Sequence, residues 1–183
     1  MPKKRGAPLV NWGIEPPVIL EFEELGRVVK PPWDFLARAE RELRHLVAET
    51  RPEVVVTFGP DGAYGHPDHC LAGDVVTRVV QSGAEGAPRQ LLYFGFPKDQ
   101  LSHWHGQEPL SATEPSYLTV GVPYSKDDLL AFQKSLRRYK TQFLPEEIDA
   151  LSKQADDLWG GRIYLRPWFG TEEGDDLFAL KDH

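Results

Sequence analysis

Two histidines three residues apart, His66 and His69, are the side chains of this sequence best suited to do chemistry. They end the glycine- and proline-rich segment 57–69, Thr-Phe-Gly-Pro-Asp-Gly-Ala-Tyr-Gly-His-Pro-Asp-His. An imidazole can ligate a metal ion or transfer a proton near neutral pH, so one ring could bind a metal while the other reaches a substrate. Two histidines alone do not define a zinc site, and Asp68 behind Pro67 could simply cap a helix. The spacing alone leaves both interpretations open.

The segment that carries the histidines is predicted to connect a strand to a helix. Residues 53–58 are β-branched and apolar without strict alternation, which predicts an interior strand of a parallel sheet. Apolar residues recur at helical spacing over 68–80, which predicts a helix. Ligands of open α/β sheets bind at the carboxyl ends of the strands. We therefore expect His66 on the entering loop and His69 in the first helical turn, facing one pocket at this edge of the sheet.

The remaining elements alternate in the manner of a single α/β domain over residues 1–183. Residues 33–50 predict an amphipathic helix that stops before Pro52. Little structure is expected over 1–17, and 97–116 has the composition of an irregular loop. Further strands are expected over 18–22, 90–96, 117–122 and 162–168, and further helices over 126–141 and 145–159. This order predicts a three-layer, Rossmann-like sandwich with a mostly parallel sheet.

The composition indicates which classes of partner and which cellular compartment to expect. The chain carries 28 acidic against 21 basic residues, a formal net charge of −7, without a basic stripe that would favour nucleic acid or an anionic membrane. Its single cysteine, Cys70, allows no intrachain disulfide, and it is expected to be a buried structural thiol. No apolar run approaches the ~18 residues of a membrane span, and no signal peptide is recognisable. A cytoplasmic location is expected.

The histidine-bearing segment has a wider resemblance. The stretch 51–57, Arg-Pro-Glu-Val-Val-Val-Thr, followed by 60–62, Pro-Asp-Gly, and 64–69, Tyr-Gly-His-Pro-Asp-His, resembles the second signature of LmbE/PIG-L deacetylases. These zinc enzymes hydrolyse the N-acetyl group of GlcNAc-containing conjugates. The resemblance continues through 92–94 and 139–143, although Tyr139 stands where the family often has a histidine. The match covers most of the chain from about residue 14 onward.

The resemblance implies a role for each matching side chain. His69 resembles a zinc ligand of the family. His66 resembles the histidine that stabilises the tetrahedral oxyanion or protonates the leaving amine. Tyr64 resembles a tyrosine at the mouth of the substrate site, and together with Asp61 it is a substrate-binding candidate. Amide hydrolysis needs an activated water, an oxyanion stabiliser and an acid for the amine, so these residue types suit the reaction.

The family's other signature, Ala-His-Pro-Asp-Asp-Glu, does not occur in this sequence. It supplies a histidine ligand, an aspartate ligand and the aspartate general base, so the resemblance covers an N-terminally truncated version of the family fold. Three explanations stay open: a start codon placed too far downstream, a fragment or split partner, and a degenerate protein without catalysis. The first two are favoured because the second signature is intact.

The expected function follows from the presence of one signature of the family and the lack of the other. The chain is predicted to act as a zinc-dependent hydrolase that removes the N-acetyl group from a small GlcNAc-type sugar conjugate, inactive in this truncated form. The alternative is a non-catalytic binding or regulatory domain, or a split-chain partner, derived from the same family. Either a second copy or a complementing chain is the expected protein partner. No nucleic acid and no membrane is expected to bind.

Three side chains between residues 99 and 114 are further candidates for binding a metal ion or a sugar. His103 and His105 could form a metal pair if they shared one face of a strand, but the segment has no strand pattern and predicts a surface loop. Trp104 between them is expected either to pack in the core or to stack on a sugar ring.

Overall fold

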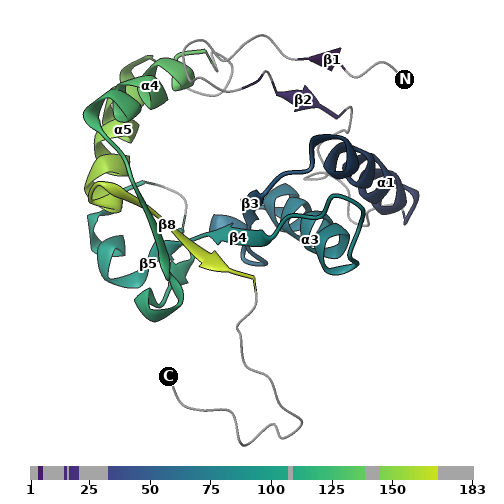
Figure 1. Ribbon diagram of the computed structural model, residues 1–183. Helices are drawn as coiled ribbons and strands as arrows, with labels where there is room; N and C mark the ends of the chain where they lie inside the picture. Colours follow the sequence, from purple (N-terminus) through teal and green to yellow (C-terminus); the bar gives the residue numbers. More distant parts are fainter. Residues whose placement is uncertain are drawn as a thin grey trace, which may run out of the picture.

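The computed structural model describes residues 4–5, 15, 17–20, 33–106, 109–138 and 145–168 (Figure 1). Its first elements are β1 (Lys4–Arg5), β2 (Val18–Ile19), α1 (Trp33–Thr50), β3 (Val54–Phe58), α2 (Gly62–Gly65), α3 (Pro67–Gln81), β4 (Gln90–Phe94) and β5 (Phe96–Pro97). They are followed by η1 (Lys98–His103), β6 (Ala112–Thr113), η2 (Pro115–Tyr117), β7 (Val120–Pro123), α4 (Lys126–Leu136), α5 (Pro145–Trp159) and β8 (Arg162–Pro167). The expected elements are present, and the expected loop 97–116 contains two 3₁₀ turns and a short strand.

A four-stranded sheet in the order β3-β4-β8-β7 forms the centre of the structure. β3 and β4 are parallel, whereas β8 runs antiparallel to both β4 and β7. The α/β class is confirmed, but the expectation of a mostly parallel sheet is wrong. Two helices, α4 and α5, separate β7 from β8, and they return the chain to the end of the sheet where β7 stops. There the N–H of Tyr124 donates to the carbonyl of Gly161 (3.1 Å), so β8 must run back alongside β7.

Helices cover opposite faces of this sheet (Figure 1). The hydroxyl of Tyr93 in β4 lies 2.6 Å from the hydroxyl of Thr77 in α3. The next residue, Phe94, meets Trp159 of α5 edge to face, with ring centroids 6.4 Å apart. Because neighbouring residues of a strand point to opposite faces, α3 and α5 lie on different sides of β4. Within the described ranges, no helix is both long and apolar enough to cross a membrane.

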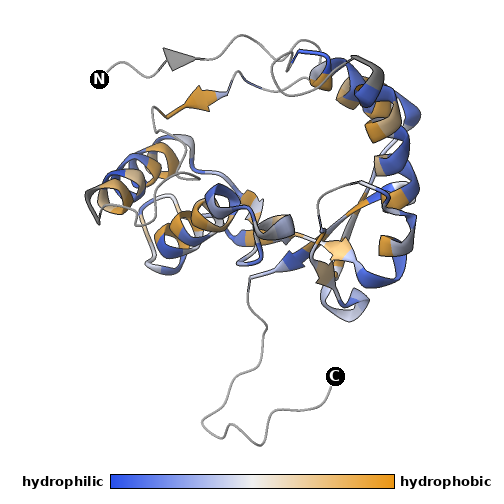
Figure 2. Ribbon diagram, turned by 180° about the vertical axis from the view of Figure 1, so that it is seen from behind, coloured by the Kyte–Doolittle hydropathy of each residue, from blue (hydrophilic) through white to orange (hydrophobic). Residues whose placement is uncertain are grey.

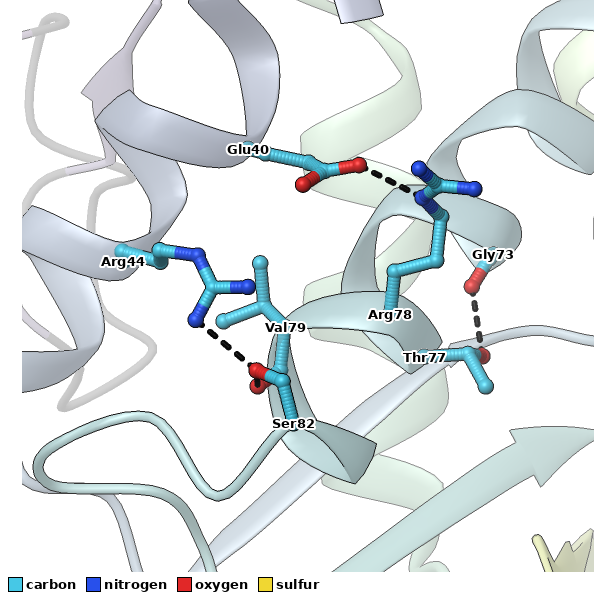
Figure 3. Close-up of polar contacts among 7 residues, drawn as sticks. All are labelled: Glu40, Arg44, Gly73, Thr77, Arg78, Val79 and Ser82. Atoms are coloured by element: carbon cyan, nitrogen blue, oxygen red, sulfur yellow. Dashed lines mark hydrogen bonds and ion pairs between the residues drawn. The ribbon is translucent and has the colours of Figure 1, made fainter. Parts of the chain in front are cut away.

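Helix α1 packs along α3 and forms an outer part of the same layer (Figure 1). Both helices alternate between hydrophobic and hydrophilic residues along the chain, as amphipathic helices do (Figure 2). Val79 of α3 is fully buried, while Arg78 beside it forms an ion pair with Glu40 of α1 (Figure 3). Arg44 of α1 donates a hydrogen bond to Ser82 at the end of α3 (2.8 Å; Figure 3). Apolar burial and polar contacts therefore hold α1 to α3 together.

Strand β3 lies at the edge of the described sheet, so the expectation of an interior strand is wrong. The side chains of Val54 and Val56 are 45% and 54% exposed. Val55 and Thr57, which point to the α3 side, are partly buried. A strand that is apolar on both faces is normally covered on both, which is why the sequence predicted an interior position. In the residues that the structure describes, one face and one edge of β3 have no such cover.

The contrast between Val79 and Val56 gives a stability prediction. Val79→Ala is expected to lower the free energy of unfolding by about 2–3 kcal/mol, because it removes two buried methyl groups and leaves a cavity. Val56→Ala, at an exposed position, is expected to change it by less than about 0.5 kcal/mol. Urea unfolding of the two variants measures both values. Comparable losses in the two variants would mean that Val56 is covered in solution.

A tyrosine between β7 and α4 makes the stability of the folded chain depend on pH in the alkaline range. Burial, together with the hydrogen bond that Tyr124 donates to Asp156 (2.6 Å), raises the pKa of the Tyr124 hydroxyl to about 12. The folded state therefore holds this proton more tightly than the unfolded state, in which the pKa is about 10. The resulting stability is present in full below pH ~10 and is lost as the pH rises towards ~12. We expect the difference in Tm between the native chain and Tyr124→Phe to shrink across this range; a constant difference would contradict the assignment.

Candidate active site

Two glycines fix the segment between β3 and α3 against the end of the strand. Gly62 has φ +58°, and a Cβ there would lie 2.6 Å from the Sγ of Cys70. A Cβ on Gly73 of α3 would lie 2.4 Å from the carbonyl oxygen of Phe58, the last residue of β3. No side chain can be accommodated at either contact without a shift of its neighbours. The first turns of α3 are thus held directly at the carboxyl end of β3.

This packing brings the two predicted histidines together. His66 is the N-cap of α3 and His69 lies in its first turn, with the ring centroids 4.7 Å apart and the ring planes tilted by 35°. Both side chains are partly exposed. His66 at the helix start and His69 in the first turn thus lie where the sequence placed them, and the pocket that they were expected to face stays a prediction. The alternative in which Asp68 caps the helix does not hold, because the N-cap is His66, whose Nδ1 accepts a hydrogen bond from the N–H of Asp68 (3.2 Å).

The hydrogen bonds of the two imidazoles assign them opposite tautomers. The Nδ1 of His69 lies 3.2 Å from the carbonyl oxygen of Gly62. A carbonyl oxygen can only accept, so Nδ1 of His69 carries the proton and its Nε2 presents a lone pair. His66 is the reverse: its Nδ1 accepts from a backbone N–H, so the proton of the neutral ring is on Nε2. One ring thus offers a lone pair at Nε2, and the other offers an N–H donor.

Aromatic rings hold His69 in place. Its imidazole stacks on Phe58 with centroids 3.9 Å apart and planes within 2° of parallel. Tyr64 meets the same imidazole edge to face at 5.2 Å and meets that of His66 at 5.7 Å. The structure therefore places Tyr64 beside both histidines.

Asp61, the fourth predicted site residue, lies beside Gly59 and Arg166. A Cβ on Gly59 would lie 2.7 Å from the Oδ1 of Asp61 and 3.0 Å from the Nη2 of Arg166. The guanidinium of Arg166 in β8 also stacks over the ring of Tyr93, 4.7 Å from its centroid. Sequence reasoning missed Arg166, because only the antiparallel register that places it opposite Tyr93 brings it to this end of β3.

A metal ion would need more ligands than this part of the site offers. Across the described ranges, no three His, Cys, Asp or Glu side chains are grouped so that they could hold a metal ion. A catalytic zinc site normally uses three protein ligands and one open position. The two imidazoles alone could therefore supply only part of the ligand set of a zinc ion.

The remaining candidates lie apart from the histidine pair. His103 and His105 are exposed as expected, and the Nδ1 of His103 lies 3.2 Å from the carbonyl oxygen of Asp157. Trp104 is partly buried against the apolar cluster around Phe96. Cys70 is only partly buried. The segment 139–143 falls outside the described residues.

Comparison with known proteins gives a consistent result. The sequence model of the GlcNAc-PI de-N-acetylase family (PIG-L) matches residues 13–80. The chain is 29% identical over 173 residues to a 1D-myo-inositol 2-acetamido-2-deoxy-alpha-D-glucopyranoside deacetylase 2 of Catenulispora acidiphila, covering 77% of this chain and 57% of the relative. The chain is 30% identical over 161 residues to the 1D-myo-inositol 2-acetamido-2-deoxy-alpha-D-glucopyranoside deacetylase of Corynebacterium urealyticum, covering 77% of this chain and 44% of that relative. One of the same name in Corynebacterium glutamicum is 50% identical over 117 residues (57% and 37%). The chain thus spans about half the length of the curated relatives it matches.

Proposed function

The chain belongs to the PIG-L/LmbE family of GlcNAc-PI de-N-acetylases, and from this premise we propose that it supplies the two-histidine half of a zinc-dependent N-deacetylase site. The observation that carries the proposal is the opposite tautomers of His66 and His69. A zinc-dependent hydrolase that cleaves an amide can use a neutral imidazole with a free lone pair as a metal ligand and a separate N–H donor for the developing oxyanion. The two rings, 4.7 Å apart, offer one of each.

Each side chain then has a distinct task. His69 would bind zinc through Nε2, while its Nδ1–H, held by the carbonyl of Gly62, fixes the ring orientation. Zinc, when bound, would supply Lewis-acid activation of the amide and of the attacking water. His66 would donate its Nε2–H to the oxygen on which charge develops, or pass that proton to the leaving amine. Tyr64, edge to face with both rings, and Asp61 would line the approach of the substrate.

The proposal requires residues that the described half-site does not contain. The other zinc ligands and the general base would come from outside the described residues, in the same polypeptide or in a second one. The edge of β3 that the described residues leave uncovered offers a place for them, because a parallel strand added there would end beside His66 and His69. The exposed side chains of Val54 and Val56 would then be covered. A homo-oligomer is not required by this arrangement.

The relatives support a substrate class for the proposal. The proteins similar to this chain are named as deacetylases of an N-acetylglucosaminyl inositol. We take a small N-acetylated glucosaminyl conjugate as the substrate. The second candidate function is a metal-free domain that binds such a conjugate without cleaving it, and the absence of a three-ligand cluster in the described ranges favours it.

Titration of the isolated chain with N-acetylglucosaminyl inositol, followed by NMR, tests the site assignment. We expect the ring signals of Tyr64, His66 and His69 to shift, because these rings would line the bound acetamide. The ring of His45, exposed on α1, is the internal control and is expected to stay unchanged. Shifts at His45 alone, or none at the three site rings, would contradict the proposal. Binding that zinc does not strengthen, in a form completed with the missing ligands, would instead favour the metal-free alternative.

A further inference from the structure

The residue before Tyr64 has a backbone conformation that its side chain disfavours. Ala63 has φ 68° and ψ −42°, whereas its neighbours Gly62 and Gly65, also at positive φ, have no Cβ. A residue with a Cβ populates this region rarely, and it stays there only when its surroundings impose the conformation. Glycine would adopt it more readily. The alanine must therefore be held in this conformation by contacts with its surroundings.

The first of these contacts is apolar. The side chain of Ala63 is 5% exposed and packs in a cluster with Phe96 and Leu158. Tyr64 packs against the same cluster. The Ala63 methyl group thus anchors the turn between β3 and α3 to the apolar core on the α5 side of the sheet.

The second contact comes from residues 98–106 and 109–113, together named the strap. The N–H of Ser111 in the strap donates to the carbonyl oxygen of Ala63 (2.7 Å). The two ends of the strap are joined to each other, since β5, which precedes it, pairs with β6, and Lys98 lies 3.6 Å from Glu114. Its side chains Leu101, Trp104 and Leu110 pack against the cluster that buries Ala63. The hydrogen bond from the strap and the packing of the methyl group in the core thus hold Ala63 in place together.

A clamped Ala63 peptide would control both neighbours of the site. On one side, the carbonyl of Gly62 holds the Nδ1–H of His69. On the other, the ring of Tyr64 contacts the imidazoles of His66 and His69. We infer that Ala63 is a positioning residue, through which the strap fixes Tyr64 and His69 relative to each other. Its importance for catalysis rests on the proposed function, whereas the positioning itself does not.

Ala63→Gly tests the inference, because it keeps the backbone conformation accessible and removes only the anchoring methyl group. We expect the NOEs between the Tyr64 ring and the two imidazoles to fall severalfold. The amide order parameters of residues 62–65 should drop from about 0.85 to below about 0.6. Ala155→Gly, at an equally buried position on α5, is the matched control: it should lower the Tm without changing these NOEs. Unchanged NOEs and order parameters in Ala63→Gly would overturn the inference.

A second pair of variants tests the strap directly. Ser111→Pro removes the N–H that holds the Ala63 carbonyl, whereas Ser111→Ala keeps it. We expect the Tyr64 NOEs to weaken in Ser111→Pro and to persist in Ser111→Ala; equal NOEs in two folded variants would contradict the role of the strap. If Ser111→Pro does not fold, Ala63→Gly decides alone. These measurements use neither zinc nor substrate, so they succeed or fail independently of the proposed deacetylase activity.

Discussion

In a form of this protein completed with the missing ligands and loaded with zinc, His69→Ala is expected to lose the metal. His66→Ala is expected to retain it and to lower kcat by about 10²- to 10³-fold. The lone pair at Nε2 of His69 is the one available for a metal, because its Nδ1–H is bound by the Gly62 carbonyl. His66 offers an N–H at the equivalent position, which suits an oxyanion or a departing amine. The two variants should therefore separate metal binding from turnover.

Zinc content and kcat, measured on the same preparations, check this separation. His45→Ala is the control, because His45 is exposed on α1 and contributes to neither function. It should change zinc content and kcat little. Equal loss of zinc in His66→Ala and His69→Ala would show that both imidazoles are ligands, and retention of zinc only in His69→Ala would show that the two roles are reversed.

Adding a segment with a His-Pro-Asp-Asp signature is expected to convert weak zinc binding into tight binding and to create deacetylase activity. The described residues contain no three-ligand cluster, and a catalytic zinc site normally needs three protein ligands. The same segment would also supply the general base. Without that base no group would take the proton of the attacking water, and this loss is separate from the loss of zinc ligands. The segment can be fused in cis or added as a second chain. Competition with a chelator measures the zinc affinity of each form.

The matched control for this experiment is the same segment with both aspartates changed to asparagine. It keeps the length and the apolar strand, so it should still cover the edge of β3, but it offers no carboxylate to the metal. We expect it to leave zinc binding weak and turnover absent. Activity with the asparagine segment would show that the carboxylates are not the missing groups.

The sequence predicted the local structure better than the assembly of the sheet. Helical periodicity over 33–50 and the β-branched run before Phe58 gave α1 and β3 nearly residue for residue. An apolar strand reads the same whether it is parallel or antiparallel, so the direction of β8 was missed. The two consecutive helices expected between β7 and β8 were the signal that could have revealed it. The edge position of β3 was missed because both of its faces are apolar.

The proximity of the two histidines was predictable from the sequence, but their tautomers were not. The spacing of His66 and His69 and the turn between them placed the two rings together. The tautomers could not be predicted, because they depend on which backbone group each Nδ1 meets. The contribution of Ser111 was also hidden, since its segment has the composition of an irregular loop and acts through a backbone N–H. Long-range backbone contacts of this kind leave no pattern in a single sequence.

The central claim is that His66 and His69 supply part of a zinc deacetylase site, and that the ligands and the general base of the His-Pro-Asp-Asp signature, which does not occur in the sequence 1–183, have to be added. The most direct measurement is the zinc content of this chain after dialysis, paired with amine release from N-acetylglucosaminyl inositol. We predict well under one zinc per chain and no amine release above the buffer control. Stoichiometric zinc together with turnover by residues 1–183 alone would contradict the claim.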